Sequence, residues 1–341
     1  MDTVLHAIDG NPIPDNHKAG FFTGHGGVQL RYAIFKSPIS PAKGTVVIVH
    51  GRSECIEKYF ETIRDLTAAG LWVATFDLRG QGLSDRLLKP KRQPADTLHK
   101  HWGHVRRFAD YERDLELFLE QVVLPDCRLP VSMIAHSTGG LIALSAAPRL
   151  SGRISRLVLS APFVGLHNEA MSAARIFALA RLASLVGLGN RPLSTSSKPQ
   201  LFATNTLTSD EARFNRNIAI MTTVPDLSIS APSARWLHEC AQAIRRVNDP
   251  AHLTQITIPT LLIAPMLDGV VPFAAQEYLA KHFRAGQLLS IAGARHEVLQ
   301  EQDRYREQAL AAIHAFIPGS DASEQWDAAG LEPESGLSET V

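Results

Sequence analysis

One serine in this sequence has neighbours that can turn its hydroxyl into a nucleophile. Ser137 follows a short, mainly apolar run, 132–135, and precedes an Ala- and Leu-rich helical pattern. Ala135 and Gly139, two residues before and after it, are small enough for a strand and a helix to pack closely around a tight turn. Such a turn exposes the serine and places the amide of Thr138 at a helix N-terminus, where the dipole favours developing negative charge. A plain helix start after a buried strand has the same local pattern, so other residues must decide.

A base and a carboxylate are available at suitable places. A serine hydroxyl reacts when a base removes its proton, and a carboxylate orients that base. Asp268 directly follows the apolar run 260–264, and His296 follows the run 287–291. Taken singly, an aspartate before a glycine is typical of a turn, and a loop histidine is usually solvated. Together, three loops at strand ends in the order Ser, Asp, His match the order in α/β-hydrolases and predict a Ser137–His296–Asp268 triad.

The oxyanion that forms during attack on an ester needs a second amide donor besides Thr138. The loop after the apolar run 45–49 offers the N–H of Arg52, because Gly51 allows the backbone to approach a substrate carbonyl. We therefore expect His50 and Gly51 to contact the substrate. Two interpretations of the Arg52 side chain stay open: it leans over the pocket toward an anionic group, or it lies at the surface as most arginines do.

Two further motifs are interpreted as structural. The Gly-rich turn 77–84 lacks the Lys-Ser/Thr pair of a Walker loop and does not open a helix, as a dinucleotide-binding loop must. It is predicted to brace the nucleophile loop. His101 and His104 have a spacing that suits a metal, but no third ligand follows at ligand spacing. We assign these histidines packing or hydrogen-bonding roles and expect no metal.

The elements that must position these residues alternate along the chain. An antiparallel hairpin is predicted over 21–35, buried strands from continuous apolar runs, and helices from amphipathic patterns. The strands span 45–49, 71–76, 132–135, 156–160, 260–264 and 287–291, and the helices span 57–69, 108–123, 273–282 and 303–316. This alternation predicts an α/β fold with a mainly parallel sheet flanked by helices.

The alternation stops after the strand 156–160, which is the sixth when the two hairpin strands are counted, and no strand is apparent between 163 and 250. This part contains predicted helices over 170–188 and 234–247 and a Pro/Ser-rich loop over 191–199. We interpret it as an inserted helical cap. The chain then divides into a loosely ordered lead-in (1–20), the hydrolase-like core (21–162 and 251–317), the cap (163–250) and a flexible tail (318–341).

Composition narrows the classes of function. Of 341 residues, 45% are hydrophobic, and 34 Lys and Arg balance 34 Asp and Glu, so nothing points to a nucleic-acid partner. Three separated cysteines without a Cys-x-x-Cys pair argue against disulfides and structural zinc and fit a reducing compartment. No signal peptide is apparent, and the most apolar segment, 176–189, is shorter than the ~20 residues of a spanning helix. We expect a cytoplasmic protein, with peripheral contact of the cap with the inner face of the membrane left open.

Five stretches together resemble a known family: 50–54, 76–84, 103–115, 135–140 and 293–297. They look like the bacterial lysophospholipase and monoacylglycerol lipase branch of the α/β-hydrolases over about 21–316, and 103–115 leans toward the bacterial lysophospholipases. The resemblance implies the α/β-hydrolase fold with a helical lid and no cofactor. It also implies Ser137 as nucleophile, Asp268 and His296 as triad partners, and Arg52 and Thr138 as oxyanion donors.

These residues predict a serine ester hydrolase that cleaves the acyl ester of a single-chain lipid, a lysophospholipid or a monoacylglycerol, through an acyl-enzyme. The apolar helix face with Ile176 and Phe177 is a candidate lining for the acyl chain, and ordinary packing of the cap on the core is the alternative. A carboxylesterase, thioesterase or lactonase acting on small esters stays open, as does acyl transfer to an alcohol. A non-catalytic, hydrolase-like binding protein is the alternative from another class. The sequence leaves the head group, the acyl length and the oligomeric state undetermined.

Overall fold

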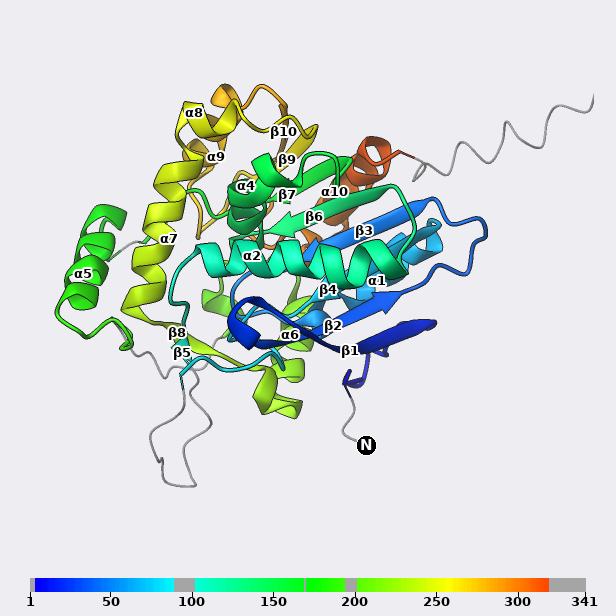
Figure 1. Cartoon of the computed structure of the whole chain (residues 1–341), viewed down its shortest axis with the longest axis horizontal. Helices are drawn as coiled ribbons and strands as arrows, with labels where there is room; N and C mark the ends of the chain where they lie inside the picture. The colour runs from blue at the N-terminus through cyan, green and yellow to red at the C-terminus, as the bar shows by residue number, and fades with distance from the viewer. Residues whose placement is uncertain (1–3, 89–101, 169, 194–200, 319–341) are drawn as a thin grey trace, which may run out of the picture.

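An eight-stranded sheet forms the centre of the molecule (Figure 1). The computed structural model describes residues 4–88, 102–168, 170–193 and 201–318. In this part of the chain the strands are β1 (His17–Thr23), β2 (Gln29–Phe35), β3 (Gly44–Val49), β4 (Leu71–Phe76), β6 (Val131–His136), β7 (Arg156–Ser160), β9 (Thr260–Pro265) and β10 (Gly286–Ile291). Their order is β1-β2-β4-β3-β6-β7-β9-β10, with β1 and β2 antiparallel and the others parallel. The predicted α/β fold with a mainly parallel sheet is confirmed.

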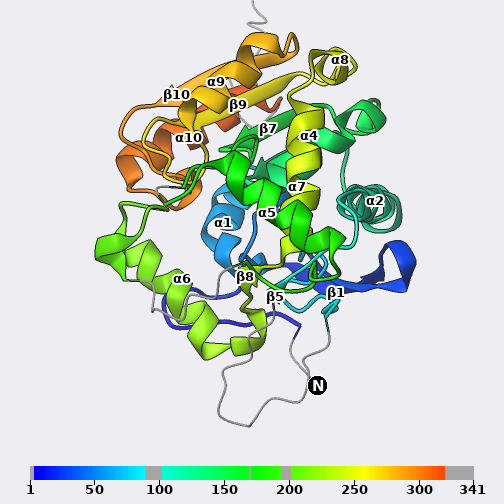
Figure 2. The ribbon, with the colours of Figure 1, turned by 90° about the vertical axis from the view of Figure 1, so that its left-hand side faces the viewer.

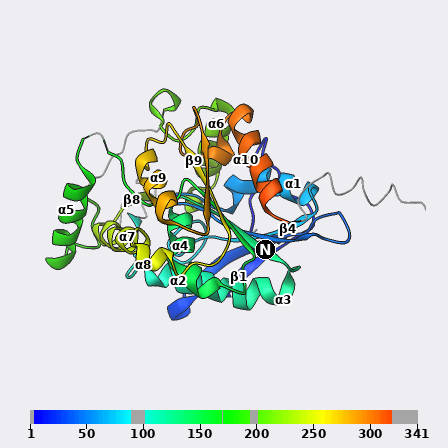
Figure 3. The same ribbon diagram turned by 90° about the horizontal axis from the view of Figure 1, so that it is seen from above.

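Helices cover both faces of this sheet (Figure 3). On one face, α1 (Phe60–Ala68) and α10 (Asp303–Phe316) pack against the sheet through one apolar cluster. On the other, α2 (Ala109–Phe118) and α4 (Thr138–Leu150) belong to a second cluster, and α9 (Phe273–His282) also contributes to it. The inner strands are buried along their whole length because both faces are covered, which is why their sequences are continuous apolar runs.

The predicted elements differ from the observed ones at a few boundaries. β1 begins at His17, inside the expected lead-in, because this edge strand pairs with β2 without an apolar pattern of its own. The single helix predicted over 108–123 is divided in the structure. The α-helix α2 ends at Phe118, and the chain continues through a wider, π-helical turn (Leu119–Val123) into the short α3 (Leu124–Asp126). Pro125 has no N–H to donate, and the amide of Leu124 bonds to the carbonyl of Leu119 instead, which widens the turn.

The segment between β7 and β9 contains more elements than predicted. It holds α5 (Ala173–Leu185), α6 (Glu211–Thr223), β8 (Ser230–Pro232), α7 (Ala234–Val247) and α8 (Pro250–Leu253). The expectation that no strand occurs here is wrong, because β8 pairs with β5 (Trp102–Gly103) in a small second sheet. The helix α6 was not predicted, since among its residues only Phe214 and Ile220 are buried and the apolar pattern is weak. The predicted loop 191–199 and tail lie largely outside the described residues.

The outer helix α5 lies along α7 (Figure 2) and leaves apolar side chains exposed. Leu182 and Leu185 are 57% and 73% exposed. Within the described ranges, no helix is both long enough and apolar enough to cross a bilayer. Contact of this helix with a membrane surface stays a prediction.

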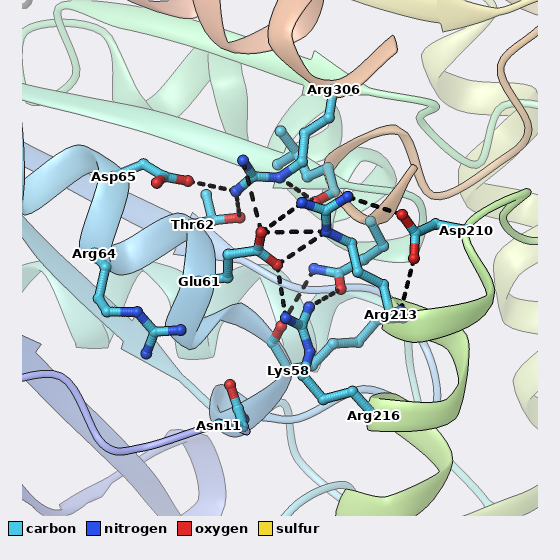
Figure 4. A network of polar contacts seen from close by, with 12 residues as sticks. Asn11, Lys58, Glu61, Thr62, Arg64, Asp65, Asp210, Arg213, Arg216 and Arg306 are labelled. Carbon is cyan, nitrogen blue, oxygen red and sulfur yellow. Dashed lines mark hydrogen bonds and ion pairs between the residues drawn. The ribbon is translucent and has the colours of Figure 1, made fainter. Parts of the chain in front are cut away.

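Two parts of the cap are attached to the core by different forces. The helix α7 buries Trp236, Cys240 and Ile244 in the apolar cluster that also contains α4. In contrast, α6 is held mainly by charge (Figure 4). Glu61 of α1 accepts hydrogen bonds from Arg213 at 2.6 Å and from Arg216 at 2.7 Å, so one carboxylate links two cap arginines to the core.

We expect the substitution Glu61→Gln to loosen α6. Glutamine preserves the shape of the side chain but removes the charge that two guanidinium groups share. A weakened charged hydrogen bond of about 1 kcal/mol corresponds to roughly fivefold faster amide hydrogen exchange over 211–223. The matched control is Glu120→Gln, whose exposed pair with Arg153 lies away from α6. Equal exchange rates in wild type and Glu61→Gln would contradict the assignment.

Candidate active site

The predicted nucleophile sits on a sharp turn between β6 and α4. Ser137 has φ 49° and ψ −114°, a conformation that L-residues rarely adopt. The turn is fixed by hydrogen bonds from the Ser137 amide to the carbonyl of Ser160 and from the Phe163 amide to the carbonyl of Ser137. Gly139 is required for space, because a β-carbon there would overlap the carbonyl oxygen of Val49. The strand, the turn and the glycine together present the hydroxyl at the edge of the sheet.

The structure brings the three predicted triad residues together. The Nε2 atom of His296 lies 2.9 Å from Oγ of Ser137, and its Nδ1 atom lies 2.8 Å from Oδ2 of Asp268. The other carboxylate oxygen of Asp268 accepts the amides of Val270 at 2.8 Å and Val271 at 2.9 Å. The loops that carry them follow β6, β9 and β10, whose carboxyl ends meet at one edge of the sheet. This geometry suits a base that removes the serine proton while a carboxylate fixes its tautomer.

The two predicted oxyanion donors also lie beside the serine. Thr138 opens α4, and Gly51 approaches so closely that a β-carbon on it would lie 3.2 Å from Cβ of Ser137. Among the described residues, neither the Thr138 amide nor the Arg52 amide donates to a protein acceptor. Two such amides next to a nucleophile are the donors that a tetrahedral oxyanion needs.

A cavity of about 450 Å³ opens in front of the triad. Ser137 and His296 form its polar end together with Gly51, while its apolar wall comes mainly from α6 and α7. The apolar side chains that line it are Phe163, Leu166, Leu207, Phe214, Ile218, Met221, Trp236, Leu237 and Val270. This wall explains why α6 has a weak apolar pattern, since Ile218 and Met221 face a cavity rather than the core.

Three predicted substrate contacts are placed elsewhere. Ile176 and Phe177 on α5 pack half-buried against the core cluster and are not among the residues that line the cavity. The reason is that α5 packs on α7, and α7 is the helix that faces the cavity. His50 is fully buried, where it donates from Nδ1 to the carbonyl of Gly51 and accepts from the Leu78 amide. Its contacts shape the loop 50–54 instead of the cavity. This loop carries the predicted oxyanion donor Arg52 and is called the oxyanion loop below.

A buried charge cluster beneath the oxyanion loop was not predicted. Glu54 accepts the Gly51 amide at 2.5 Å and the Tyr59 hydroxyl at 2.9 Å. Lys58 lies 2.7 Å from Glu54 and 2.6 Å from Glu297, the residue after the triad histidine. The cluster therefore ties the oxyanion loop to the histidine loop. The spacing of Glu54 and Lys58, four residues apart, was the only signal of it in the sequence.

Neighbouring turns add support at the same place. The Gly-rich turn 77–84 was predicted to brace the nucleophile loop, but its contacts here go to the oxyanion loop. The side-chain oxygen of Gln81 accepts the Ser53 amide at 2.7 Å, and Asp77 accepts the Ile56 amide at 3.1 Å. His104 has the hydrogen-bonding role predicted for it, with Nδ1 2.9 Å from Oγ of Ser233, and His101 lies outside the described residues.

Charges in this region keep the buried groups in defined states. Burial raises the pKa of Glu54, but other interactions, above all the positive charge of Lys58, outweigh it and hold the pKa below its ordinary value. Burial lowers the pKa of Lys58, but Glu297 and Glu54 outweigh it and raise the pKa. Burial, aided by His296, lowers the pKa of His136 to about 4, so this imidazole is neutral at physiological pH.

We expect Lys58→Met to destabilise the fold by about 3 to 5 kcal/mol at neutral pH, because two buried carboxylates lose their shared partner. The lowered pKa of Glu54 contributes stability that is lost as pH falls below its ordinary value of 4.5. The raised pKa of Lys58 contributes stability that is lost as pH rises above 10.5. The loss of unfolding free energy relative to wild type, measured by urea denaturation, should thus be largest between about pH 4.5 and pH 10.5. As a control, Lys281→Met, which removes an exposed ion pair with Glu277, should change stability little. A Lys58→Met variant as stable as wild type at pH 7 would refute the proposed stabilising role of Lys58.

Known proteins resemble this chain over most of its length. The Hydrolase_4 family model, described as serine aminopeptidase, S33, matches residues 40–303. Probable lysophospholipase L2 of Haemophilus influenzae is 28% identical over 308 residues, covering 90% of this chain and 94% of that protein. Lysophospholipase L2 of Escherichia coli K12 is 32% identical over 312 residues, covering 87% and 86%.

Among solved structures, a soluble variant of monoglyceride lipase from Saccharomyces cerevisiae, in complex with a substrate analog, has a TM-score of 0.70. Its sequence is 20% identical, and the match covers 94% of this chain and 99% of that chain, which supports the fold. The family match, which includes the three loops of the triad and the oxyanion loop, covers most of the chain. The chain therefore belongs to the Hydrolase_4 family (serine aminopeptidase, S33) of α/β-hydrolases, with similarity to lysophospholipases and monoglyceride lipases.

Proposed function

We propose that this protein is a serine hydrolase that cleaves the acyl ester of a single-chain lipid. One observation carries the proposal: Ser137, hydrogen-bonded to His296, stands at the polar end of a cavity whose wall is otherwise largely apolar. A cavity of about 450 Å³ lies within the range of small-molecule sites. The names of the full-length relatives, lysophospholipase L2, support the same class of substrate.

The proposed reaction proceeds through an acyl-enzyme. His296, oriented by Asp268, takes the Ser137 proton as Oγ attacks the ester carbonyl carbon. The oxyanion accepts the amides of Arg52 and Thr138 until it collapses and breaks the bond to the alcohol. The alcohol oxygen leaves with the proton from His296. Water then gives a proton to His296, attacks the acyl carbon and releases the fatty acid, and Ser137 regains its proton.

The acyl chain is proposed to lie against α6 and α7. Phe214, Ile218 and Met221 of α6 and Trp236 and Leu237 of α7 face the cavity. Burial of methylene groups against these side chains stabilises the bound lipid by roughly 0.8 kcal/mol per group. This proposal replaces Ile176 and Phe177, which the fold places outside the cavity.

A substrate panel tests the proposed function. We expect kcat/KM to rise with acyl length from acetyl to long-chain esters, and long-chain lysophospholipids and monoacylglycerols to be hydrolysed. The highest kcat/KM for acetyl or butyryl esters would favour a small-ester carboxylesterase instead. Hydrolysis of aminoacyl nitroanilides without ester hydrolysis would favour a peptidase, and acyl glycerol products in the presence of glycerol would reveal acyl transfer. No activity on any member, together with no labelling by a fluorophosphonate, would support a non-catalytic binding protein.

A further inference from the structure

Among the described residues, the side chain of Arg52 has no ion-pair partner, and it is not a fully exposed surface group. It is half-buried, and it lines the same cavity as Ser137. Its guanidinium lies 5.7 Å from the centre of the Trp236 ring, and its Nη2 atom donates to the carbonyl of Ser230 in β8. The Nε atom is buried without a hydrogen-bond partner among the described residues. No carboxylate in that part of the chain pairs with this guanidinium, unlike those of Arg31, Arg79 and Arg213.

Space for the guanidinium is provided by a glycine. A β-carbon on Gly103 would lie 3.3 Å from Nε of Arg52, so any larger residue would press on the charged group. Gly103 belongs to β5, whose pairing with β8 also fixes the carbonyl of Ser230. Trp236, at the start of α7, covers another side of the arginine. The two-strand sheet and the tryptophan thus hold the guanidinium in one position.

The surroundings that the structure describes do not neutralise this charge. Burial lowers the pKa of Arg52 to about 10, which leaves it protonated at neutral pH. The titratable groups that face it are Tyr111 and Cys240, and burial raises the pKa of both, so neither carries a negative charge. The remaining charged side chains of the cavity wall, Glu54, Lys58 and Glu297, are hydrogen-bonded to one another in a separate cluster. A buried cation without a counter-ion is costly unless a ligand supplies the opposite charge.

We propose that the guanidinium of Arg52 binds the phosphodiester of a lysophospholipid and thereby sets the preference for the head group. This inference rests on the proposed function. The backbone amide of Arg52 points to the oxyanion, and its side chain leads from there to β8 and Trp236. In a lysophospholipid, a glycerol unit separates the ester from the phosphate, a span comparable to the length of an arginine side chain. The acyl chain then occupies the α6 side of the cavity, and the phosphate occupies the Arg52 side.

The planar guanidinium suits this ligand. Its N–H groups form a fork that matches two phosphate oxygens. A monoacylglycerol offers only hydroxyl groups at the same place and leaves the positive charge uncompensated. The protein should therefore prefer the phosphodiester substrate over the neutral lipid with the same acyl chain.

The test compares kcat/KM for oleoyl lysophosphatidylglycerol and mono-oleoylglycerol, both in the same neutral detergent micelles. A charged hydrogen bond contributes enough for Arg52→Gln to lower the ratio of the two values by about 10- to 100-fold. Arg52→Lys, which retains the charge but loses the fork, should keep part of the preference. Arg86→Gln is the matched control, because Arg86 also donates to cap carbonyls, those of Asp226 and Ser228, but does not line the cavity. It should leave the ratio unchanged.

The outcomes separate the possible failures. An unchanged ratio in Arg52→Gln, or an equal fall in Arg86→Gln, would overturn the phosphate assignment and leave Arg52 as a contact between cap and core. If wild type hydrolyses neither lipid, the proposed function fails instead. An experiment on wild type alone covers the case in which the Arg52 variants do not fold. Glycerophosphoglycerol should inhibit hydrolysis of mono-oleoylglycerol competitively and glycerol should not, whereas equal inhibition by the two would overturn the assignment.

Discussion

Replacing Ser137 with alanine is expected to lower kcat for ester hydrolysis by roughly four to six orders of magnitude. In the proposed reaction the hydroxyl oxygen of Ser137 bonds to the acyl group, and it lies 2.9 Å from Nε2 of His296. The variant should fold normally, since alanine fills the same turn and the fixing hydrogen bonds involve only the backbone of this residue. Rate assays with a nitrophenyl ester and a long-chain lipid measure the loss of kcat. Urea denaturation of the same samples measures whether the variant is folded.

Ser132→Ala provides the control for this experiment. Ser132 lies on the same strand, is also buried, and its hydroxyl bonds to that of Ser155. Its removal should leave kcat within about twofold, and a fluorophosphonate should label wild type and Ser132→Ala but not Ser137→Ala. Comparable rates in wild type and Ser137→Ala would end the proposal of serine catalysis.

The substitution Asp268→Asn should lower kcat by about 10³- to 10⁴-fold with little loss of binding. The Oδ1 atom of Asp268 accepts two amides, from Val270 and Val271, so an asparagine must place its own oxygen there. Its NH₂ group then faces Nδ1 of His296, which must accept a hydrogen bond. The proton of the imidazole moves to Nε2, which can no longer receive the Ser137 proton.

A pH profile tests this tautomer argument. Full activity of Asp268→Asn at every pH would show that the carboxylate does not orient the base. Asp249→Asn, at an exposed helix start where the side chain accepts only the Ala251 amide, should behave as wild type. The pair of variants separates the loss of a charge near the triad from the loss of a charge elsewhere.

The sequence predicted those elements whose structure has a cause in the local pattern of apolar residues. Strands buried on both faces are continuous apolar runs, and β4 and β7 have the bounds predicted for them. The bounds of helices α7, α9 and α10 also agree with prediction, since the sequence shows both the apolar face and the end residues of each helix. The triad residues could be proposed because each follows a readable strand, and parallel strands bring their carboxyl ends to one edge.

Other features depend on contacts between distant segments and leave little local signal. Two short strands, β5 and β8, are too brief for any periodicity, yet they position the Arg52 guanidinium. The Ala/Leu-rich sequence of α5 is apolar on its exposed side as well, so it does not show which neighbour Ile176 and Phe177 meet. The third member of the buried cluster, Glu297, is more than two hundred residues from Lys58 and Glu54, and only the fold reveals their contact.

The different attachment of the two cap helices has a consequence for engineering. The helix α7 shares an apolar core with α4, which begins directly after the proposed nucleophile Ser137, so exchanging α7 would disturb the geometry of the proposed triad. The helix α6 instead meets the core through ion pairs and a small separate cluster around Ile220. Only the helix itself, residues 211–223, is therefore suited to exchange, because 205–209 is hydrogen-bonded to the loop that carries His296. Under the proposed function, replacing α6 with the helix of a relative that keeps Glu61 and the two arginines would change the acyl-length preference and leave the proposed triad in place.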